Sequence, residues 1–524
     1  MQPVLINGQW RDSSGSDSFQ AENPATCELL PDVYPVSSWE DCDAALQAAV
    51  QAAEALWQLP GTIVADFLEA YASRIEERAE ELVEMAHLET ALPKSPRLAD
   101  IELPRTTGQL RQAAAAARNG SWSLPTIDTK TGIRSVYRSI GPVCVLGPNN
   151  FPFAFGSISG GDFAAAVAAG NPVIAKANSS HPGTTRLLAE EAQLAAEQTG
   201  LPAGSIQLLY RMPHADGERL VADARIGATG YTGSRSAGLS LKAAADARGK
   251  PIYLELSSVN PIVVLPGALQ ERGADLAEEF TGSCLMGTGQ FCTNPGLVIL
   301  VDGEVTRTFV EAVTQGFQDA PVGTLLSRSV QTSLQSNVSI LLEAGAQLLA
   351  GNTSVEEDRC CFANTLLQIT GDQFVAAPET MQTEAFGNSS LLMVANSTEQ
   401  VCEAIDQLEG NLTGCIYSHT GGEDDADYDR IAPRLRQRVG RLLNDKMPTG
   451  VAVSSAMNHG GPYPATGHPG FTAVGIPASL IRFSMLQSYD NVRSHRLPAV
   501  LQDTNPTGET WRLIDECWSQ ADVS

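Results

Sequence analysis

Residues 141–177 have the sequence GPVCVLGPNNFPFAFGSISGGDFAAAVAAGNPVIAKA, and this stretch decides the fold. The apolar runs at 143–146 and 172–175 have the length of strands, and the alanine-rich segment at 160–169 between them is typical of a helix. A strand, a helix and a second strand in this order predict one unit of a parallel sheet.

The same alternation continues to residue 255. Further strands are predicted at 205–210, 226–229 and 252–255. The helices predicted around them cover 183–199, 214–222 and 234–245, and helical spacing also covers 41–56, 65–88 and 105–117. Alternating residues at 133–145 indicate strands. We therefore predict an α/β fold with a doubly wound, Rossmann-like parallel sheet.

A second α/β unit is predicted to begin near Ser258. Its strands are expected at 261–265, 296–301, 391–395 and 414–417. Its helices are expected at 269–286 and 305–316. A chain of 524 residues, 43% of them hydrophobic, is long enough for two or three domains with sizeable cores.

The charge balance excludes several kinds of partner. With 60 acidic and 34 basic residues, the net charge of -26 disfavours binding to nucleic acids and anionic membrane surfaces. The first residues, MQPVLING, lack the pattern of a signal peptide, and no stretch is apolar enough to span a bilayer. We expect a cytoplasmic protein.

The cysteines and histidines form no local metal-ligand pattern. The 10 cysteines include no CxxC pair, the neighbours Cys360 and Cys361 fit no ligand motif, and the seven histidines are dispersed. The sequence therefore predicts neither a metal site nor a disulfide framework.

Two segments carry candidate reacting groups. Cys292 lies in the polar turn GQFCTNPG at 289–296, where a nucleophile could be exposed, although a buried cysteine is the simpler interpretation of this residue alone. Glu255 ends the strand in YLELS at 253–257. Burial would raise the pKa of this carboxyl and make it a base near neutral pH, whereas a solvated glutamate is the alternative.

Two further segments could bind charge. Asn150, in PNNFP at 148–152, follows a predicted strand and could donate to an oxyanion, although proline and asparagine also favour a plain turn. The segment GYTGSRSAG at 230–238 joins a strand to a helix, whose N-terminus could bind a pyrophosphate. Its glycine spacing is not GxGxxG, so this signal alone is weak.

Together these four segments resemble the aldehyde dehydrogenase superfamily, whose motifs occur here in the family's order. Lys176 matches the family's strand lysine, and further matches are INGQW at 6–10, NPAT at 23–26 and EAFG at 384–387. The resemblance covers essentially the whole chain. The sequence departs from the family at Asn388, usually a proline, and at Asn149.

Other segments resemble one branch of the family. They are RTTGQLR at 105–111, GGD at 160–162, HPGT at 181–184, PTGV at 448–451 and HGGPYPAT at 459–466. That branch contains the α-ketoglutarate semialdehyde (2,5-dioxovalerate) dehydrogenases and the NADP-dependent fatty aldehyde dehydrogenases.

The resemblance implies a covalent mechanism that needs no metal. Cys292 attacks the aldehyde carbon, and the oxyanion lies between the Asn150 side chain and the Cys292 backbone N–H. Glu255 then activates the water that hydrolyses the thioester. The residues implied to bind the cofactor are Lys176, Ser179, Arg211, Gly230, Gly233, Ser234, Glu384 and Phe386. The resemblance implies two roles for Lys176, one with the catalytic residues and one at the adenosine ribose of the cofactor.

The cofactor is predicted to be NADP, with NAD as the other possibility. In NAD-preferring members a glutamate commonly lies three residues after the strand lysine. Ser179 stands there in this chain, and its hydroxyl can donate to a 2′-phosphate. Arg211 could add a charge-assisted contact. The alternative is that Ser179 begins a turn and Arg211 is solvated.

The branch resemblance favours α-ketoglutarate semialdehyde as the substrate. Register against the family puts Arg105 on a helix along the substrate tunnel, where a guanidinium could bind a carboxylate. The alternative is an Arg105 paired within its helix. A long-chain aldehyde is the second candidate substrate, for which Phe151, Phe153 and Phe155 are suited, but their spacing prevents all three from facing one helical tunnel wall.

The resemblance also implies an organisation. We expect a cofactor-binding domain at 1–124 and 144–257, and a catalytic domain at 258–483. A bridging oligomerisation element is expected at 125–143 and 484–524, in a homodimer or homotetramer. A non-catalytic protein on this fold would be expected to lack Cys292 or Glu255. Acyl transfer to coenzyme A is a further alternative, which a water-activating Glu255 disfavours.

Overall fold

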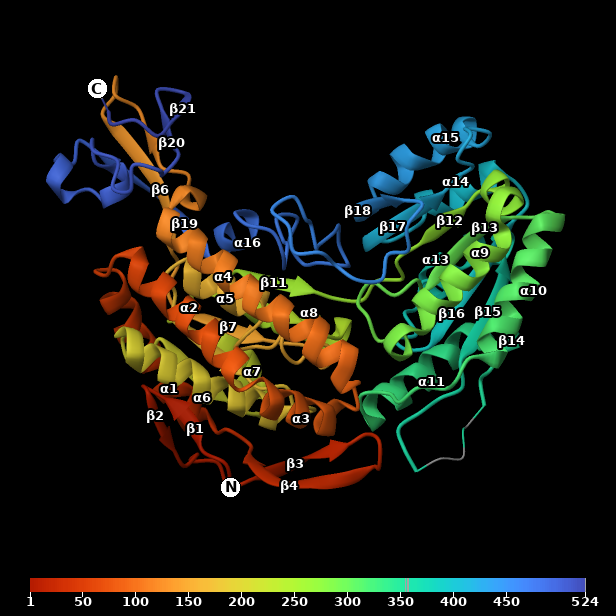
Figure 1. Cartoon of the computed structure of the whole chain (residues 1–524), viewed down its shortest axis with the longest axis horizontal. Helices are drawn as coiled ribbons and strands as arrows, with labels where there is room; N and C mark the ends of the chain where they lie inside the picture. Colours follow the sequence, from red (N-terminus) through yellow and green to blue (C-terminus); the bar gives the residue numbers. More distant parts are fainter. Residues whose placement is uncertain (354, 356–357, 524) are drawn as a thin grey trace.

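The computed structural model describes residues 1–353, 355 and 358–523. Figure 1 shows two α/β lobes side by side, with a smaller β element projecting from the first lobe. The N-terminus lies at the base of the first lobe, and the C-terminus lies at the tip of the projecting element.

The first lobe contains a seven-stranded sheet. Its strands, in order, are β11 (Ile252–Glu255), β10 (Ala228–Thr232), β7 (Val143–Leu146), β8 (Val173–Lys176), β9 (Ile206–Leu209), β1 (Val4–Ile6) and β2 (Gln9–Arg11). The first five are parallel neighbours, as the strand–helix alternation predicts, and β1 and β2 extend the edge in the antiparallel sense.

Helices cover this sheet because its strands are apolar on both faces and bury almost every side chain. The helices of this lobe are α1 (Trp39–Leu56), α2 (Gly61–Glu77), α3 (Ala79–Thr90), α4 (Leu103–Asn119), α5 (Gly161–Ala168), α6 (Pro182–Thr199), α7 (His214–Val221) and α8 (Arg235–Asp246). A separate hairpin, β3 (Ser18–Asn23) and β4 (Glu28–Pro35), lies below them in Figure 1.

One predicted helix is two helices in the structure. The spacing at 65–88 predicts a single helix, but Arg78 leaves the helical conformation with φ -101 and ψ 15. Its guanidinium forms ion pairs with Glu81, Glu190 and Glu191. Glu190 and Glu191 are on α6, so these ion pairs hold the point where the helix breaks. They are tertiary contacts, which local periodicity cannot predict.

The second lobe contains another seven-stranded sheet. Its order is β14 (Gln347–Ala350), β15 (Thr365–Thr370), β16 (Ser389–Ala395), β13 (Leu297–Val301), β12 (Ile262–Val264), β17 (Asn411–Tyr417) and β18 (Val439–Asn444). All neighbours are parallel except β14 with β15. Its helices are α9 (Pro266–Leu285), α10 (Glu304–Asp319), α11 (Arg328–Glu343), α12 (Gly371–Ala376), α13 (Pro378–Met381), α14 (Thr398–Asp406) and α15 (Asp425–Arg436).

After β18 the chain returns to the first lobe through residues 445–483, the return segment, which contains α16 (Ala478–Ile481). This segment is joined to β11 by backbone hydrogen bonds. Leu256 N–H donates to Ala465 O at 2.8 Å, and Gly467 N–H donates to Leu254 O at 3.0 Å. The two lobes are therefore connected both at residue 258 and along the return segment.

The projecting element is a five-stranded sheet of β19 (Ser484–Asp490), β6 (Ile133–Ser139), β5 (Thr126–Ile127), β20 (Arg512–Ile514) and β21 (Cys517–Ser519). The short helices elsewhere are η1 (Lys94–Glu102), η2 (Ser121–Ser123), η3 (Met286–Gly289), η4 (Ser494–Arg496) and η5 (Ala499–Leu501). Among the described residues, none of the helices combines the length and apolar character needed to cross a bilayer.

Candidate active site

The candidate site lies where the end of β11 meets the second lobe and the return segment. Glu255 is the last residue of β11, Cys292 lies in the turn between η3 and β13, and His459 belongs to the return segment. One ligand atom from each lies within 4.8 Å of the others. The fold thus brings together Cys292 and Glu255, the two residues predicted as partners. His459 was quoted only as part of a motif, and no role was predicted for it.

The three side chains make short contacts. Nε2 of His459 lies 2.9 Å from Oε1 of Glu255 and 3.5 Å from Sγ of Cys292. The side chains of Glu255 and His459 are each only 1% exposed. Neither carboxylate oxygen of Glu255 accepts a hydrogen bond of good geometry. Both oxygens therefore retain lone pairs that a water molecule in the site could use.

The turn that carries Cys292 is fixed by its surroundings. Nδ2 of Asn260 donates to the carbonyl oxygens of Cys292 and Asn294, at 2.9 Å each. Gly289 has φ +67, and a Cβ at this position would lie 2.1 Å from Gly387 O. Only glycine permits this approach, which packs the turn against the loop that follows α13.

The thiol is not activated by its surroundings in this state. Burial raises the pKa of Cys292 well above its ordinary value, and the neighbouring Glu255 carboxylate raises it further. The Arg105 guanidinium lowers this pKa but does not cancel the effect. The free protein therefore holds Cys292 as a neutral thiol near neutral pH.

Asn150 lies beside the cysteine turn, on the loop after β7. Its Nδ2 donates to Gln290 O at 3.0 Å, and its own carbonyl accepts from Nη2 of Arg97 at 3.0 Å. A side-chain amide has two N–H donors, so one remains after the bond to Gln290. Within the described residues, the backbone N–H of Cys292 has no backbone acceptor. The cysteine turn thus has one unused amide N–H of Asn150 beside Gln290 and the backbone N–H of Cys292 itself.

A cluster of cationic and aromatic side chains lies near the thiol, close enough for Arg105 to shift the pKa of Cys292. The Arg105 guanidinium lies 5.1 Å from the centroid of Phe155 and 6.0 Å from that of Phe151. Arg97 lies 4.3 Å from Phe151 and 5.5 Å from Phe291. Two of the five side chains in this cluster are therefore Arg105 and Phe151, the residues predicted to bind substrate.

Arg105 does not pair with the nearby Glu102, although pairing within its own helix was the alternative interpretation of this residue. Both oxygens of the nearby Glu102 are occupied, Oε2 by Arg97 at 2.5 Å and Oε1 by the backbone N–H groups of Phe153 and Ala154. Nε and Nη2 of Arg105 are buried and have no hydrogen-bond partner. Burial also lowers the pKa of Arg105. A buried cation with unused donors is costly unless an anion joins it.

A second group of cations lies at the carboxyl end of the first sheet. Lys176 ends β8, Ser179 lies in the loop that follows, and Arg211 follows β9. Burial, and then the positive charge of Arg211, lower the pKa of Lys176 to about 8. No carboxylate is among the groups that shift this pKa. The carboxyl edge of a parallel sheet is where nucleotides bind in such folds, and these donors fit an anionic one.

The predicted glycine loop has mixed roles. Gly230 lies inside β10, where a Cβ would meet Oδ2 of Asp162 at 2.5 Å, so packing alone requires a glycine there. Gly233 follows the strand and donates its N–H to Glu255 O at 3.1 Å. Ser234 is the N-cap of α8 without a side-chain capping bond. The loop is therefore hydrogen-bonded to Glu255 through Gly233 and continues directly into the N-terminus of α8.

Glu384 and Phe386 line a hollow beside the cysteine turn, together with Ser258 and Phe291. Burial raises the pKa of Glu384 to about 7, although the nearby hydroxyl of Ser257 and backbone N–H of Ser258 oppose the rise. Both predicted ribose and ring contacts thus belong to one cavity that adjoins Cys292.

The departure at Asn388 has a structural reason. Its side chain is fully buried, and Nδ2 donates to Phe362 O and to Oδ1 of Asn364, at 2.8 Å each. A proline could form neither bond. Asn388 therefore fixes the loop after Gly387 to the segment before β15.

The comparisons with known sequences agree on one family. The family model described as the aldehyde dehydrogenase family matches residues 10–462. The chain is 37% identical to alpha-ketoglutaric semialdehyde dehydrogenase 2 of Azospirillum brasilense, over 96% of this chain and 97% of that protein. It is 34% identical to the alpha-ketoglutaric semialdehyde dehydrogenase of Acinetobacter baylyi, over 98% of both.

Solved structures agree on the fold. Lactaldehyde dehydrogenase from Escherichia coli superposes with a TM-score of 0.80 at 22% identity, over 93% of this chain and 98% of that one. PnpE in complex with nicotinamide adenine dinucleotide gives a TM-score of 0.80 at 21% identity, over 94% and 99%. The predicted fold is confirmed.

The electrostatics of Cys292 predict opposite effects of two neighbours on thiol reactivity. Glu255→Gln removes a negative charge, so it should lower the pKa of Cys292 and speed alkylation by iodoacetamide at pH 7. Arg105→Ala removes a positive charge, so it should raise this pKa and slow alkylation. The measurement is the pH profile of Cys292 alkylation by peptide mass spectrometry, without cofactor.

The exposed Cys517 provides an internal reference in each sample, because neither substitution lies near it. Profiles of Cys292 that shift in the same direction in both variants would contradict this electrostatic account.

Proposed function

The chain belongs to the aldehyde dehydrogenase family, and from this premise we propose that it oxidises α-ketoglutarate semialdehyde to α-ketoglutarate with NADP. Cys292 is the nucleophile and Glu255 the general base. The observation that carries the substrate is the pair of buried Arg105 nitrogens, Nε and Nη2, that have no hydrogen-bond partner near the thiol.

The first step is attack of the Cys292 sulfur on the aldehyde carbon. The thiol proton passes to Glu255 or His459, whose acceptor atoms are within reach of the sulfur. The carbonyl oxygen becomes an oxyanion that the remaining N–H of Asn150 and the backbone N–H of Cys292 can stabilise. Loss of one such donor typically raises the barrier by about 2.7–4 kcal/mol.

A bound nicotinamide supplies the acceptor for the hydride, which converts the thiohemiacetal on Cys292 into a thioester. Glu384 and Phe386 line the adjoining hollow and would bind the nicotinamide end. Glu255, after passing any proton taken from the thiol to solvent, takes a proton from water, and the resulting hydroxide attacks the thioester carbon. The C–S bond then breaks, the free acid dissociates, and the thiolate remains on Cys292 near His459 and Arg105.

This arrangement disfavours the two alternatives. A non-catalytic protein on this fold has no use for a thiol, a carboxylate and an imidazole within 4.8 Å in a buried site. Transfer to coenzyme A needs no water-activating base, whereas here a buried Glu255 carboxylate lies within 4.8 Å of the thiol. Hydrolysis to the free acid is therefore the better-supported outcome.

Charge selects the substrate class. Desolvated Arg105 can form two parallel hydrogen bonds with a carboxylate. The relatives named alpha-ketoglutaric semialdehyde dehydrogenases support this assignment. A long-chain aldehyde would need apolar side chains free to line its path, but Phe151 and Phe155 pack against each other at 5.3 Å near the Arg105 guanidinium, and Phe153 is fully buried.

NADP is supported by the donors at the end of the first sheet. Lys176, Ser179 and Arg211 offer an ammonium, a hydroxyl and a guanidinium, and no glutamate stands at Ser179 to repel a 2′-phosphate. The N-terminus of α8 beyond Gly233 and Ser234 would receive the pyrophosphate.

We further propose the predicted division into a cofactor-binding domain at 1–124 and 144–257, a catalytic domain at 258–483 and an oligomerisation element formed by the rest. The projecting sheet supports the last part, because it exposes Met485, Leu486 and Trp518 by 45%, 57% and 54%. Such apolar exposure favours pairing with a second subunit in a homodimer or homotetramer.

The mechanism predicts that Glu255→Gln separates the two halves of the reaction. A general base contributes about 10²- to 10⁴-fold, so steady-state turnover should fall by that factor while a burst of one NADPH per site persists. Cys292→Ala should abolish both but retain NADP binding. Stopped-flow absorbance measures the burst, and loss of the burst in Glu255→Gln would contradict the proposed division of roles.

The substrate assignment is tested with Arg105→Ala on the semialdehyde and on pentanal. The loss of the Arg105 charge affects the thiol equally with both substrates. The difference between the two losses in kcat/KM therefore measures how much Arg105 contributes to binding the substrate carboxylate. A lost charge-assisted hydrogen bond costs about 1.5–3 kcal/mol, so kcat/KM should fall on the order of 10- to 100-fold further for the semialdehyde. Arg111→Ala, on the same helix but exposed and paired with Glu76, is the control. Equal losses on both aldehydes would overturn the assignment.

The cofactor assignment is tested with Arg211→Ala and Ser179→Glu. Both should raise KM for NADP, the first by roughly 10-fold or more, and leave KM for NAD nearly unchanged or lower. Initial rates with each cofactor measure this. Wild-type efficiencies that are equal for both cofactors and unchanged in Arg211→Ala would refute a 2′-phosphate contact.

A further inference from the structure

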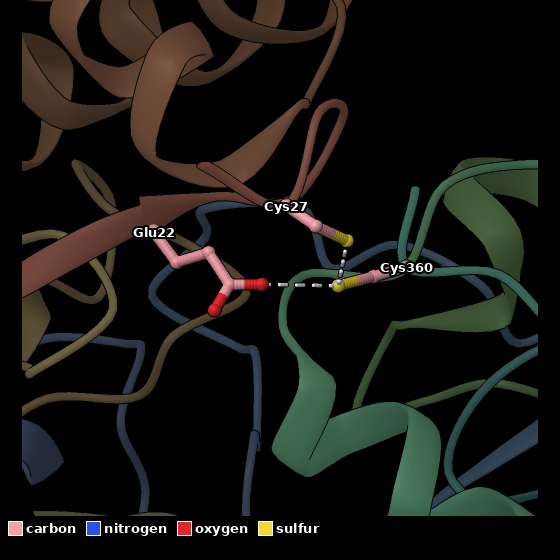
Figure 2. A group of neighbouring side chains, drawn as sticks. All are labelled: Glu22, Cys27 and Cys360. Carbon is pink, nitrogen blue, oxygen red and sulfur yellow. Dashed lines mark hydrogen bonds between the residues drawn. The ribbon is translucent and has the colours of Figure 1, made fainter. Parts of the chain in front are cut away.

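Two cysteines far apart in the sequence meet between the lobes. Cys27 lies in the turn between β3 and β4, and Cys360 lies in the segment before β15. Figure 2 shows their sulfur atoms facing each other, 3.7 Å apart, with Oε1 of Glu22 3.9 Å from the Cys360 sulfur. One ligand atom from each residue lies within 4.8 Å of the others.

The backbone around this group is held on both sides. The N–H of Cys360 donates to Pro24 O at 2.8 Å, which joins the segment to the hairpin. The N–H of Cys27 donates to Asn23 O at 2.8 Å, and Cys27 has a φ of 54, which few residues other than glycine adopt. The hairpin therefore aims the Cys27 sulfur at the second lobe at a conformational cost.

We propose that Glu22, Cys27 and Cys360 form a binding site for a thiophilic divalent cation, Zn²⁺, with water as the fourth ligand. In a tetrahedral site with Zn–S bonds of about 2.3 Å, two sulfur atoms lie about 3.8 Å apart. The observed separation of 3.7 Å matches this value. A disulfide would need the atoms at about 2.05 Å.

The surroundings suit this ion. Cys360 is fully buried, whereas Cys27 and Glu22 are partly exposed and leave a path from solvent. Nε of Arg328 donates to Oε1 of Glu22 at 2.8 Å and would orient the carboxylate, as outer partners of metal ligands do. Binding releases the two thiol protons to solvent. Two thiolates, one carboxylate, Zn²⁺ and the guanidinium then sum to zero charge.

The site would fasten one lobe to the other. The hairpin packs against α3 in the first lobe, and Cys360 precedes β15 in the second. A metal that binds only the folded chain stabilises it by mass action. The sequence predicted no metal site because its ligands are 333 residues apart and follow no local spacing.

The test uses the full-length Cys292→Ala protein, because Glu255, Cys292 and His459 form another candidate ligand group. Co²⁺ is added to chelator-treated, reduced protein, and the thiolate-to-cobalt band in the near ultraviolet is followed. We expect one equivalent to bind and Zn²⁺ to displace it. Cys27→Ala should abolish the band, Glu22→Gln should weaken binding by at least about tenfold, and Cys517→Ala should have no effect.

A thermal melt gives a second readout. Cys27 is half-buried, so substituting it perturbs folding less than substituting the fully buried Cys360. Zn²⁺ should raise the Tm of the parent and of Cys517→Ala but not that of Cys27→Ala. The proposal is overturned if the parent gives no thiolate band, or if Cys27→Ala retains the band and its stoichiometry. A Cys27–Cys360 disulfide in the isolated protein, seen by non-reducing peptide mapping, would overturn it in favour of a redox pair.

Discussion

The site depends on one docking contact, between the end of β11 and the return segment. Glu255 forms an isolated bridge with Thr466, and Leu256 bonds to Ala465 in the same register. This contact brings His459 to the carboxylate of Glu255 and so to Cys292. Because the return segment begins after β18, the last strand of the second lobe, these three side chains meet only when both lobes are folded and docked.

The electrostatics at Cys292 follow from this arrangement. Burial and Glu255 keep the sulfur protonated, and Arg105 acts in the opposite direction. On the proposed mechanism, activation then comes with the cofactor. The cationic nicotinamide ring would lower the pKa of Cys292, whereas a carboxylate bound at Arg105 would oppose this effect. A free, solvent-reachable thiolate would instead be open to oxidation.

Sequence periodicity predicted the parts of the fold that depend on the local spacing of apolar residues. The five parallel strands of the first sheet and their helices follow from apolar runs and spacing, whereas the break at Arg78 follows from ion pairs with α6. Cys292, Glu255 and Asn150 could be found because each sits at a strand end or turn with a recognisable motif. The unpaired donors of Arg105 and the proximity of His459 to Glu255 could not be predicted, because both depend on how segments distant in the sequence pack together. The pairing of Cys27 with Cys360 is the extreme case.

The strong negative charge of the chain makes local cations necessary at the proposed anion sites. A net charge of -26 repels both a carboxylate substrate and a dinucleotide at long range, but salt screens that field over about 8 Å at physiological ionic strength. Inside the protein, screening is weak, and the nearest charges dominate. Arg105 near the thiol and Lys176 with Arg211 at the sheet edge lie where the two anions would bind. We therefore expect these local cations, and not the overall charge, to decide which anions bind.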